Sequence, residues 1–319
     1  MNGSEGIAAT RSAELWQRWG HHLAIAAAYA AVYEVTRHLS FPQWMLTAGL
    51  RLACLLLMPV RYWPALALGE GVPLIETAAL CVSDFGAAWA VSECVPMILL
   101  WMAVLEPVRR HWTLYDERGR LRMPLVLSTA LCTAIITAVA TLLTALTAII
   151  HTPTGAWPDP GTGWGGYLLA YMLAAYLGAL TLTPFILALR ERYLALGRAP
   201  LTLERVWRSA LLRDVLGWVL PLLTVMTCLA VHAHDDGLRQ VARIALIFPV
   251  LGLAWRHGWH GTAVGGMTAS VALAITAPGL LADPATLQVQ AILALVVSGT
   301  LLVGARSTAR RVTNRPVRT

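Results

Sequence analysis

Apolar residues occur along this chain in long runs, and short segments between the runs hold most of the charged residues. A run of about 20 apolar residues is long enough for a helix to cross a hydrocarbon core roughly 30 Å thick. In lipid, a helix satisfies every backbone hydrogen bond within its own segment. The pattern predicts an all-α, polytopic transmembrane helix bundle of about ten spans, near residues 23–41, 43–60, 62–82, 85–105, 123–150, 164–189, 215–234, 239–255, 258–278 and 285–305.

The arginines predict how this bundle is oriented. The chain has no lysine, and most of its 24 arginines lie in every second connecting segment. Because arginine-rich connections stay in the cytoplasm, we expect both termini there, in a bacterial cytoplasmic (inner) membrane. The predicted organisation is a cytoplasmic N-terminal segment (1–22), an integral membrane domain (23–305) and a basic cytoplasmic tail (306–319).

Two segments have more than one interpretation. Arg11 and Arg18 precede an Ala-rich stretch, as in a secretory signal, but the apolar run continues through Val35 and favours an uncleaved first span. The segment 190–214 places apolar residues on one helical face with arginines around it. We interpret it as an interfacial amphipathic helix, with a partner-docking helix as the alternative.

Composition excludes several classes of protein. The chain is 57% hydrophobic and 13% charged, whereas soluble domains have about 25% charged residues. Its net charge of +7 lies in connecting segments, not on a basic face interleaved with aromatics, so no nucleic-acid partner is expected. The five cysteines form no Cys-x-x-Cys pair, and there is no phosphate loop, nucleophile elbow or zinc-protease motif. We therefore expect neither an enzyme nor a cofactor.

Five ionisable residues lie inside the first four apolar runs: Glu34, Arg51, Glu70, Glu76 and Glu93. A charged residue near the bilayer centre costs on the order of 3 kcal/mol, so it needs a partner or a wet cavity. Glu34, Glu76 and Glu93 lie near the outer ends of their spans. They predict an acidic vestibule with Arg51 at its floor; the alternative is a structural ion pair and carboxylates that only fix helix packing.

Arg51 and Glu70 are predicted to be partners. Arg51 lies ten residues before Arg61 and Glu70 nine residues after it, and the second and third spans are expected to turn there. At about 1.5 Å of rise per residue, both lie roughly 15 Å deep, near the midplane. Arginine is also suited to hold a carboxylate or phosphate with two hydrogen bonds, so a small anionic ligand is a candidate here.

A predicted inner turn at residues 255–261 contains two histidines. His257 and His260 have a spacing that fits a metal pair, but no carboxylate or thiolate lies beside them in the sequence, so we predict no metal site. Gly-x-x-x-Gly is typical of close helix packing in membranes. The residues predicted to pack this turn are Trp255, Gly258, Gly261 and Gly265.

Three stretches resemble a known family: 49–70, 180–184 and 248–261. They are similar to the MASE-type bacterial integral membrane sensor domain, and most of all to the membrane half of hexose-phosphate sensor histidine kinases. The resemblance covers nearly the whole chain, through motifs made mostly of Gly, Pro and Trp. Arg51 and Glu70 match charged positions of that subgroup, whereas much of the wider family has an apolar residue where Arg51 stands.

The resemblance implies a membrane-embedded sensor or regulatory subunit of a bacterial signal-transduction system. In that family a kinase or cyclic-dinucleotide synthesis domain follows the membrane block, and this chain stops at Thr319 without one. We therefore expect action through a partner: a sensor kinase, a cyclase or a transporter-like receptor protein. The alternative is a small-solute transporter or its membrane binding component, because transporters also use charges near the midplane. An intramembrane enzyme is a third reading, for which the glutamates lack companion groups.

Overall fold

The computed structural model describes residues 3–151, 163–196, 209–277 and 283–313, and within them it contains helices and no strand. Seven of the described helical segments are long and apolar enough to cross a membrane. This confirms the predicted all-α bundle of membrane-spanning helices. The seven segments are Val60–Phe85, Ala87–His111, Met123–Ala148, Trp164–Leu194, Ala210–His232, Asp236–Thr276 and Pro284–Arg306.

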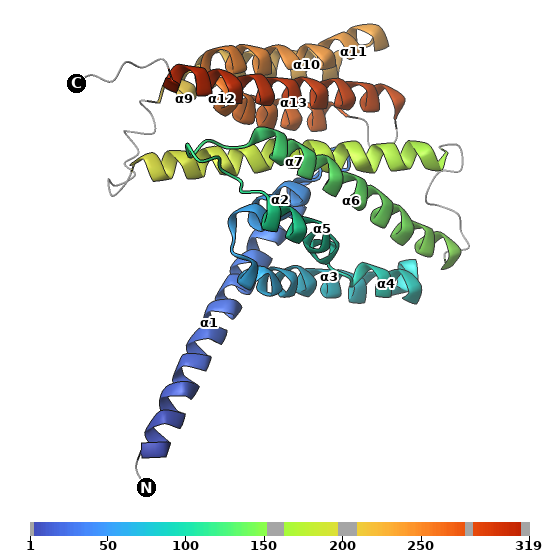
Figure 1. The fold of residues 1–319 in the computed structure, drawn as a ribbon. Coiled ribbons are helices and arrows are strands. Elements are labelled where there is room, and N and C mark those ends of the chain that lie inside the picture. The colour runs from blue at the N-terminus through green and yellow to red at the C-terminus, as the bar shows by residue number, and fades with distance from the viewer. Residues whose placement is uncertain (1–2, 152–162, 197–208, 278–282, 314–319) are drawn as a thin grey trace, which may run out of the picture.

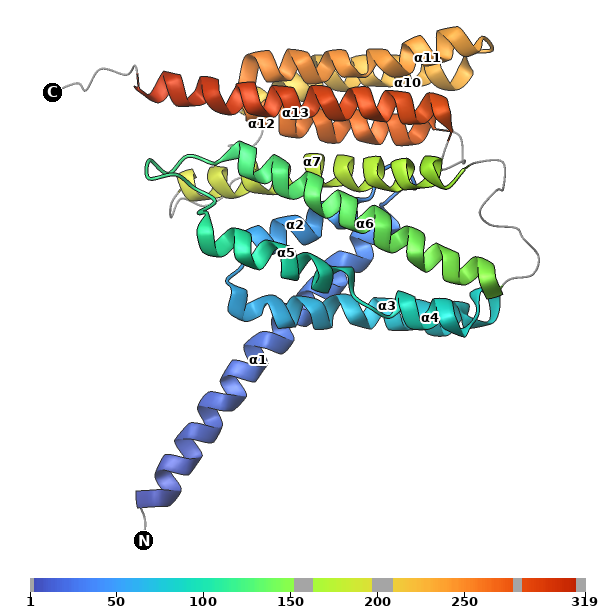
Figure 2. The ribbon, with the colours of Figure 1, turned by 45° about the vertical axis from the view of Figure 1, so that its right-hand side comes forward.

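The first part of the chain forms a layer of helices crossed by the long first helix (Figure 1). The helix α1 is continuous through residue 22, so no break marks the predicted start of the membrane domain. Its N-terminal portion projects away from the other helices in both views (Figures 1 and 2). The elements are α1 (Gly3–His38), α2 (Leu46–Leu57), η1 (Val60–Tyr62), α3 (Trp63–Phe85), α4 (Ala87–Glu93) and α5 (Met97–His111).

The rest of the chain supplies a central layer and an opposite outer layer. In Figures 1 and 2, α6 and α7 lie with α2 between the layer of α3–α5 and the layer of α10–α13. In α7, 67% of the most apolar stretch is buried inside the structure, against 17–44% in the other six segments, so α7 is the central helix. The elements are α6 (Met123–His151), α7 (Trp164–Leu196), α9 (Ala210–Asp214), η2 (Val215–Val219), α10 (Leu220–His232), α11 (Asp236–Ala245), α12 (Ile247–Thr276) and α13 (Pro284–Thr313).

The second predicted span is a short helix inside the bundle. With 12 residues, α2 is about 18 Å long at 1.5 Å per residue, less than the hydrocarbon thickness. The chain before it turns, because Phe41 and Trp44 exchange backbone hydrogen bonds of 3.2 and 2.9 Å. Ten of its residues are buried. The helix α2 therefore covers only part of the predicted run 43–60.

Close backbone contact explains how α2 fits against α7. A Cβ atom on Gly178 would lie 1.9 Å from the carbonyl oxygen of Met45, and one on Gly49 would lie 2.4 Å from the carbonyl oxygen of Gly178. Only glycine permits this approach, because any side chain would overlap backbone atoms. Thr183 of α7 also donates a hydrogen bond of 2.9 Å to the Gly49 carbonyl.

The fourth predicted span is interrupted. Gly86, with φ 89°, turns the chain from α3 into α4, and Pro96 separates α4 from α5. Proline has no N–H and its ring collides with the preceding turn of a helix, which explains the break in the predicted run 85–105.

The predicted turn at residues 255–261 reverses the chain within α12. Gly258 has φ 62° and ψ −145°, a conformation that side chains disfavour. A Cβ on Gly261 would lie 2.1 Å from the Leu253 carbonyl oxygen, and one on Gly265 would lie 3.1 Å from the Val250 Cα. Since positions before and after Gly258 meet in reversed order, α12 consists of two antiparallel legs. The first leg together with α11 covers the predicted run 239–255, and the second leg corresponds to the predicted run 258–278. Trp255, in contrast, does not pack in this turn: its side chain is 89% exposed.

Several arginines lie where helices end on one side of the bundle. In Figure 2, α6 begins and α7 and α13 end on the same side of the bundle, which we call the basic end. The connection from α5 to α6 lies there and is folded around Asp116. A hydrogen bond from the backbone N–H of Arg120, together with one from its side chain, lowers the pKa of the Asp116 carboxyl. Residues 197–208 of the predicted amphipathic helix at 190–214, and the end of the predicted tail 306–319, lie outside the described residues.

Candidate functional site

Arg51 and Glu70 form the ion pair that their spacing predicts. Arg51 Nε donates to Glu70 Oε2 over 2.9 Å, between α2 and α3. The side chain of Glu70 is fully buried and that of Arg51 is 8% exposed. Because both charges are out of water, their stability depends on the other polar groups that surround them.

Two tyrosines of α1 complete the polar shell on one side. Tyr29 donates its hydroxyl to Glu70 Oε2 over 3.2 Å. The hydroxyl of Tyr33 accepts a hydrogen bond of 2.9 Å from Arg51 Nη2. The two residues are four positions apart, so they lie on one face of α1. That spacing is visible in the sequence, and it is the signal by which these two site residues could have been found.

The start of α5 completes the shell on the other side. The Ile98 backbone N–H donates to Glu70 Oε1 over 3.2 Å. Trp101, one turn later, places its ring 5.9 Å from the Arg51 guanidinium carbon and donates its indole N–H to Thr137 of α6 over 3.2 Å. Four helices thus meet at one buried ion pair: α1, α2, α3 and α5. We call Tyr29, Tyr33, Arg51 and Glu70 the buried cluster.

The other predicted site residues divide into two groups. Glu34 pairs with Arg37 over 2.9 Å, and its second carboxylate oxygen is buried without a partner among the described atoms. Glu93 is half-buried at the end of α4. Glu76, however, is exposed and does not join them. Six residues separate it from Glu70, about 240° around a helix, so the two side chains point to different sides of α3.

The two histidines of the turn have carboxylate partners from other helices. His257 Nε2 lies 2.7 Å from an oxygen of Asp214, and His260 Nε2 lies 3.3 Å from an oxygen of Glu191. The sequence showed no carboxylate beside them because α7 and α9 supply both. Within the described part of the chain, no group of three or more His, Cys, Asp and Glu residues could hold a metal ion.

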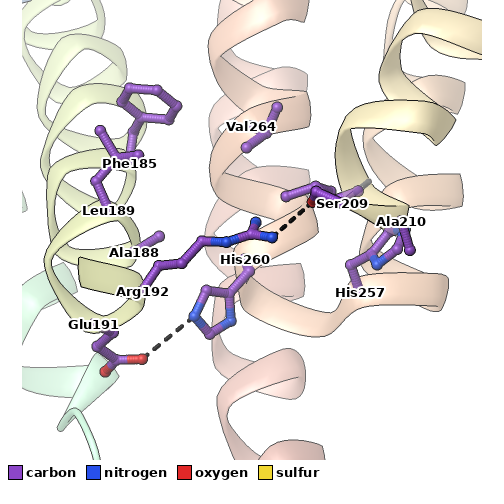
Figure 3. Close-up of a pocket in the computed structure, with 11 residues that line it drawn as sticks. Phe185, Ala188, Leu189, Glu191, Arg192, Ser209, Ala210, His257, His260 and Val264 are labelled. Carbon is purple, nitrogen blue, oxygen red and sulfur yellow. Dashed lines mark hydrogen bonds and ion pairs between the residues drawn. The ribbon is translucent and has the colours of Figure 1, made fainter. Parts of the chain in front are cut away.

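The same turn borders a cavity of about 480 Å³ (Figure 3). Arg192 of α7 reaches across it and donates to the Ser209 hydroxyl over 2.8 Å. Figure 3 shows Phe185 and Leu189 on the wall formed by α7, opposite Val264 of α12. These links hold together the basic ends of α7, α9 and the second leg of α12.

One buried charge was missed by the sequence analysis. Arg243 of α11 is 2% exposed, although it lies inside the predicted run 239–255. It donates to the Thr286 hydroxyl over 2.8 Å, and its Nε has no partner among the described atoms. No ion pair to Arg243 occurs within the described ranges. An arginine inside an apolar run is itself the signal that could have singled it out.

Seven apolar helices, close glycine contacts and a buried polar cluster define a multi-pass membrane protein. A model of the MASE1 family matches residues 21–311, which is most of the chain, and the chain belongs to this family. MASE1 is a family of membrane-associated sensor domains found in signalling proteins. The predicted MASE-type membrane sensor domain is therefore confirmed. No curated protein and no solved structure matches the chain significantly.

Proposed function

We propose that this chain is the membrane-embedded sensor or regulatory part of a bacterial signalling system and transmits its signal through a partner protein. The partner classes are a sensor kinase, a cyclase or a transporter-like receptor. Kinship with the hexose-phosphate sensor kinases is part of this proposal, and it rests on Arg51 and Glu70. No catalytic step by the chain itself is included.

The proposed topology has ten crossings in the bacterial inner membrane, with both termini in the cytoplasm. The seven apolar segments become eight when the reversal at Gly258 is counted, and α1 and α2 add two. Because α2 is too short to span the bilayer alone, its crossing includes residues 39–45 and 58–60. The arginines at the basic end support a cytoplasmic position for that end.

The observation that carries the proposal is the convergence of four helices on the Arg51–Glu70 pair. A ligand or partner shifts a helix bundle only if it binds two arrangements with different affinity. A single buried pair shared by α1, α2, α3 and α5 provides such a difference, since opening it changes the contacts of all four helices together. A small anion that binds Arg51 in place of Glu70 is the simplest ligand of this kind.

A signal-output assay tests the switch. We expect Arg51→Ala to abolish signal-dependent output while the protein is still inserted in the membrane at normal levels. Arg239→Ala is the matched control, because Arg239 is also paired with a carboxylate but lies partly exposed in α11, away from the buried cluster. If the output of Arg51→Ala still responds to the signal as in the natural protein, the Arg51–Glu70 pair is not the switch.

Cross-linking in the native membrane tests the partner. Capture of a kinase, a cyclase or a transporter-like receptor on the basic end or the bundle face supports the proposal. Recovery of the protein alone, under conditions where a known membrane complex is captured, counts against it.

One observation favours the alternative of a small-solute transporter. The short α2 lies inside the bundle and is preceded by the buried, non-helical Gln43 and Trp44, and broken helices near buried charges are a feature of transporter binding sites. Uptake of labelled hexose phosphate or another small anion by proteoliposomes that contain only this protein would favour the transporter. Lack of uptake, together with ligand-dependent cross-linking to a partner, would favour the sensor.

A further inference from the structure

A second cavity at the basic end has the chemistry of an anionic lipid site. Its volume is about 620 Å³, within the roughly 300–1,000 Å³ typical of small-molecule sites. The connection between α5 and α6, the start of α6 and the end of α13 form its walls. It is separate from the buried cluster and from the cavity in Figure 3, since they share no lining residue.

The charges of the cavity are unbalanced. Arg120, Arg122 and Arg306 line it together with a single carboxylate, that of Asp116. Asp116 is already paired with Arg120 over 2.8 Å. Within the described part of the chain, the guanidinium groups of Arg122 and Arg306 have neither an ion pair nor a hydrogen bond. Two guanidinium groups with unused donors suit a phosphate, which arginine binds with paired hydrogen bonds.

The apolar part of the cavity lies deeper in the bundle than its charges. Leu125 follows Arg122 at the start of α6, and Leu302 is one turn before Arg306 in α13, so both leucines are farther from the basic end than the arginines. Ser128 also lines the cavity, about one turn beyond Leu125. Trp112 stands at the rim and is 54% exposed, as is typical of aromatic residues at a membrane interface.

An apolar stripe continues from the cavity along α6. Leu131, Ile135 and Val139 are 43–47% exposed and follow Ser128 at helical spacings of three and four residues. An acyl chain fits such a stripe, whereas a small hydrophilic anion would use only the arginines.

We propose that this cavity binds an anionic phospholipid, with its phosphate against Arg122 and Arg306 and an acyl chain along the stripe on α6. In the proposed topology this lipid comes from the cytoplasmic leaflet. The ligand chemistry itself depends only on the cavity, so it stands whether or not the chain is a sensor.

The experiment measures lipids retained by the purified full chain. Protein in detergent is titrated with phosphatidylglycerol, phosphatidylcholine or inorganic phosphate, and bound species are counted by native mass spectrometry. We expect phosphatidylglycerol to bind and survive dilution, and the double variant Arg122→Gln, Arg306→Gln to weaken binding about thirtyfold. Arg118→Gln is the matched control, because it removes a charge from the same connection without lining the cavity; its binding should be unchanged.

Three results would overturn the proposal. Equal binding of phosphatidylcholine would show that the phosphate contacts do not select charge. Equal binding of inorganic phosphate, lost in the double variant, would identify a site for a free anion instead of a lipid. An equal loss in Arg118→Gln would show attraction to the general positive charge of this end. Each variant is shown to be folded if its elution and its thermal unfolding in neutral detergent match those of the natural protein.

Discussion

The backbone N–H of Ile98 donates to the Glu70 carboxylate over 3.2 Å, so the first turn of α5 is held by the same group that pairs with Arg51. The first N–H groups of a helix have no partner within it and carry its positive dipole end. The break at Pro96 creates such a helix start in the middle of an apolar run. The interrupted helix and the buried ion pair are therefore one structural feature.

Replacing Arg51, the cation of the buried ion pair, should lower the free energy of unfolding. Arg51→Met leaves the Glu70 carboxylate buried without its counter-charge, and the loss of a partner from a buried ion pair costs about 3–5 kcal/mol. Chemical unfolding in detergent should show this loss. The double variant Arg51→Met, Glu70→Gln should recover part of it. If the single variant unfolds like the natural protein, the pair contributes nothing to stability.

Gly178→Ala should disrupt the contact between α2 and α7. The added Cβ would lie 1.9 Å from the Met45 carbonyl oxygen, and overpacking of this kind costs about 1–3 kcal/mol or more. Gly299→Ala is the control, since nothing lies within 4 Å of its Cβ position; it should be neutral or stabilising by up to about 1 kcal/mol. Thermal unfolding of the two variants compares them directly. Equal melting temperatures would contradict the close approach.

Gly258→Ala should strain the reversal within α12. Its φ of 62° with ψ of −145° belongs to a region that only glycine visits readily, and forcing a side chain into it costs about 1–3 kcal/mol. The measurement is again unfolding in detergent. Gly20→Ala, at a helical position with nothing within 4 Å, should not lower stability. A Gly258 variant as stable as the Gly20 variant would mean that the chain does not reverse there in this conformation.

Replacing Arg243 should affect the stability of the protein differently from replacing Arg51. Its buried guanidinium has a hydroxyl partner and no ion pair in the described structure, and a buried charge without an ion pair is costly to keep out of water. Arg243→Met should therefore leave stability unchanged or raise it, because Thr286 keeps its hydrogen bond to Asp283. A loss as large as that of Arg51→Met would indicate a carboxylate partner for Arg243.

Some tertiary contacts were predictable and others were not. The depth of Arg51 and Glu70 follows from counting residues on either side of Arg61, because both helices rise at a constant rate per residue. The rotation of Glu76 away from Glu70 also follows from the helical period. The pairing of His257 with Asp214 does not, since 43 residues separate them and nothing local relates the orientation of α9 to that of α12.

The sequence by itself determined that the chain is a bundle of membrane-spanning helices, because runs of apolar residues can satisfy their backbone in lipid only as helices. It also determined the depth of each charge along its helix. Only the tertiary structure decided which helices meet at those charges. The short α2, the α5 start at Glu70 and the Gly258 hairpin depend on backbone contacts between distant segments, where the absence of a side chain at Gly178 or Gly261 permits an approach that no pattern of polarity records.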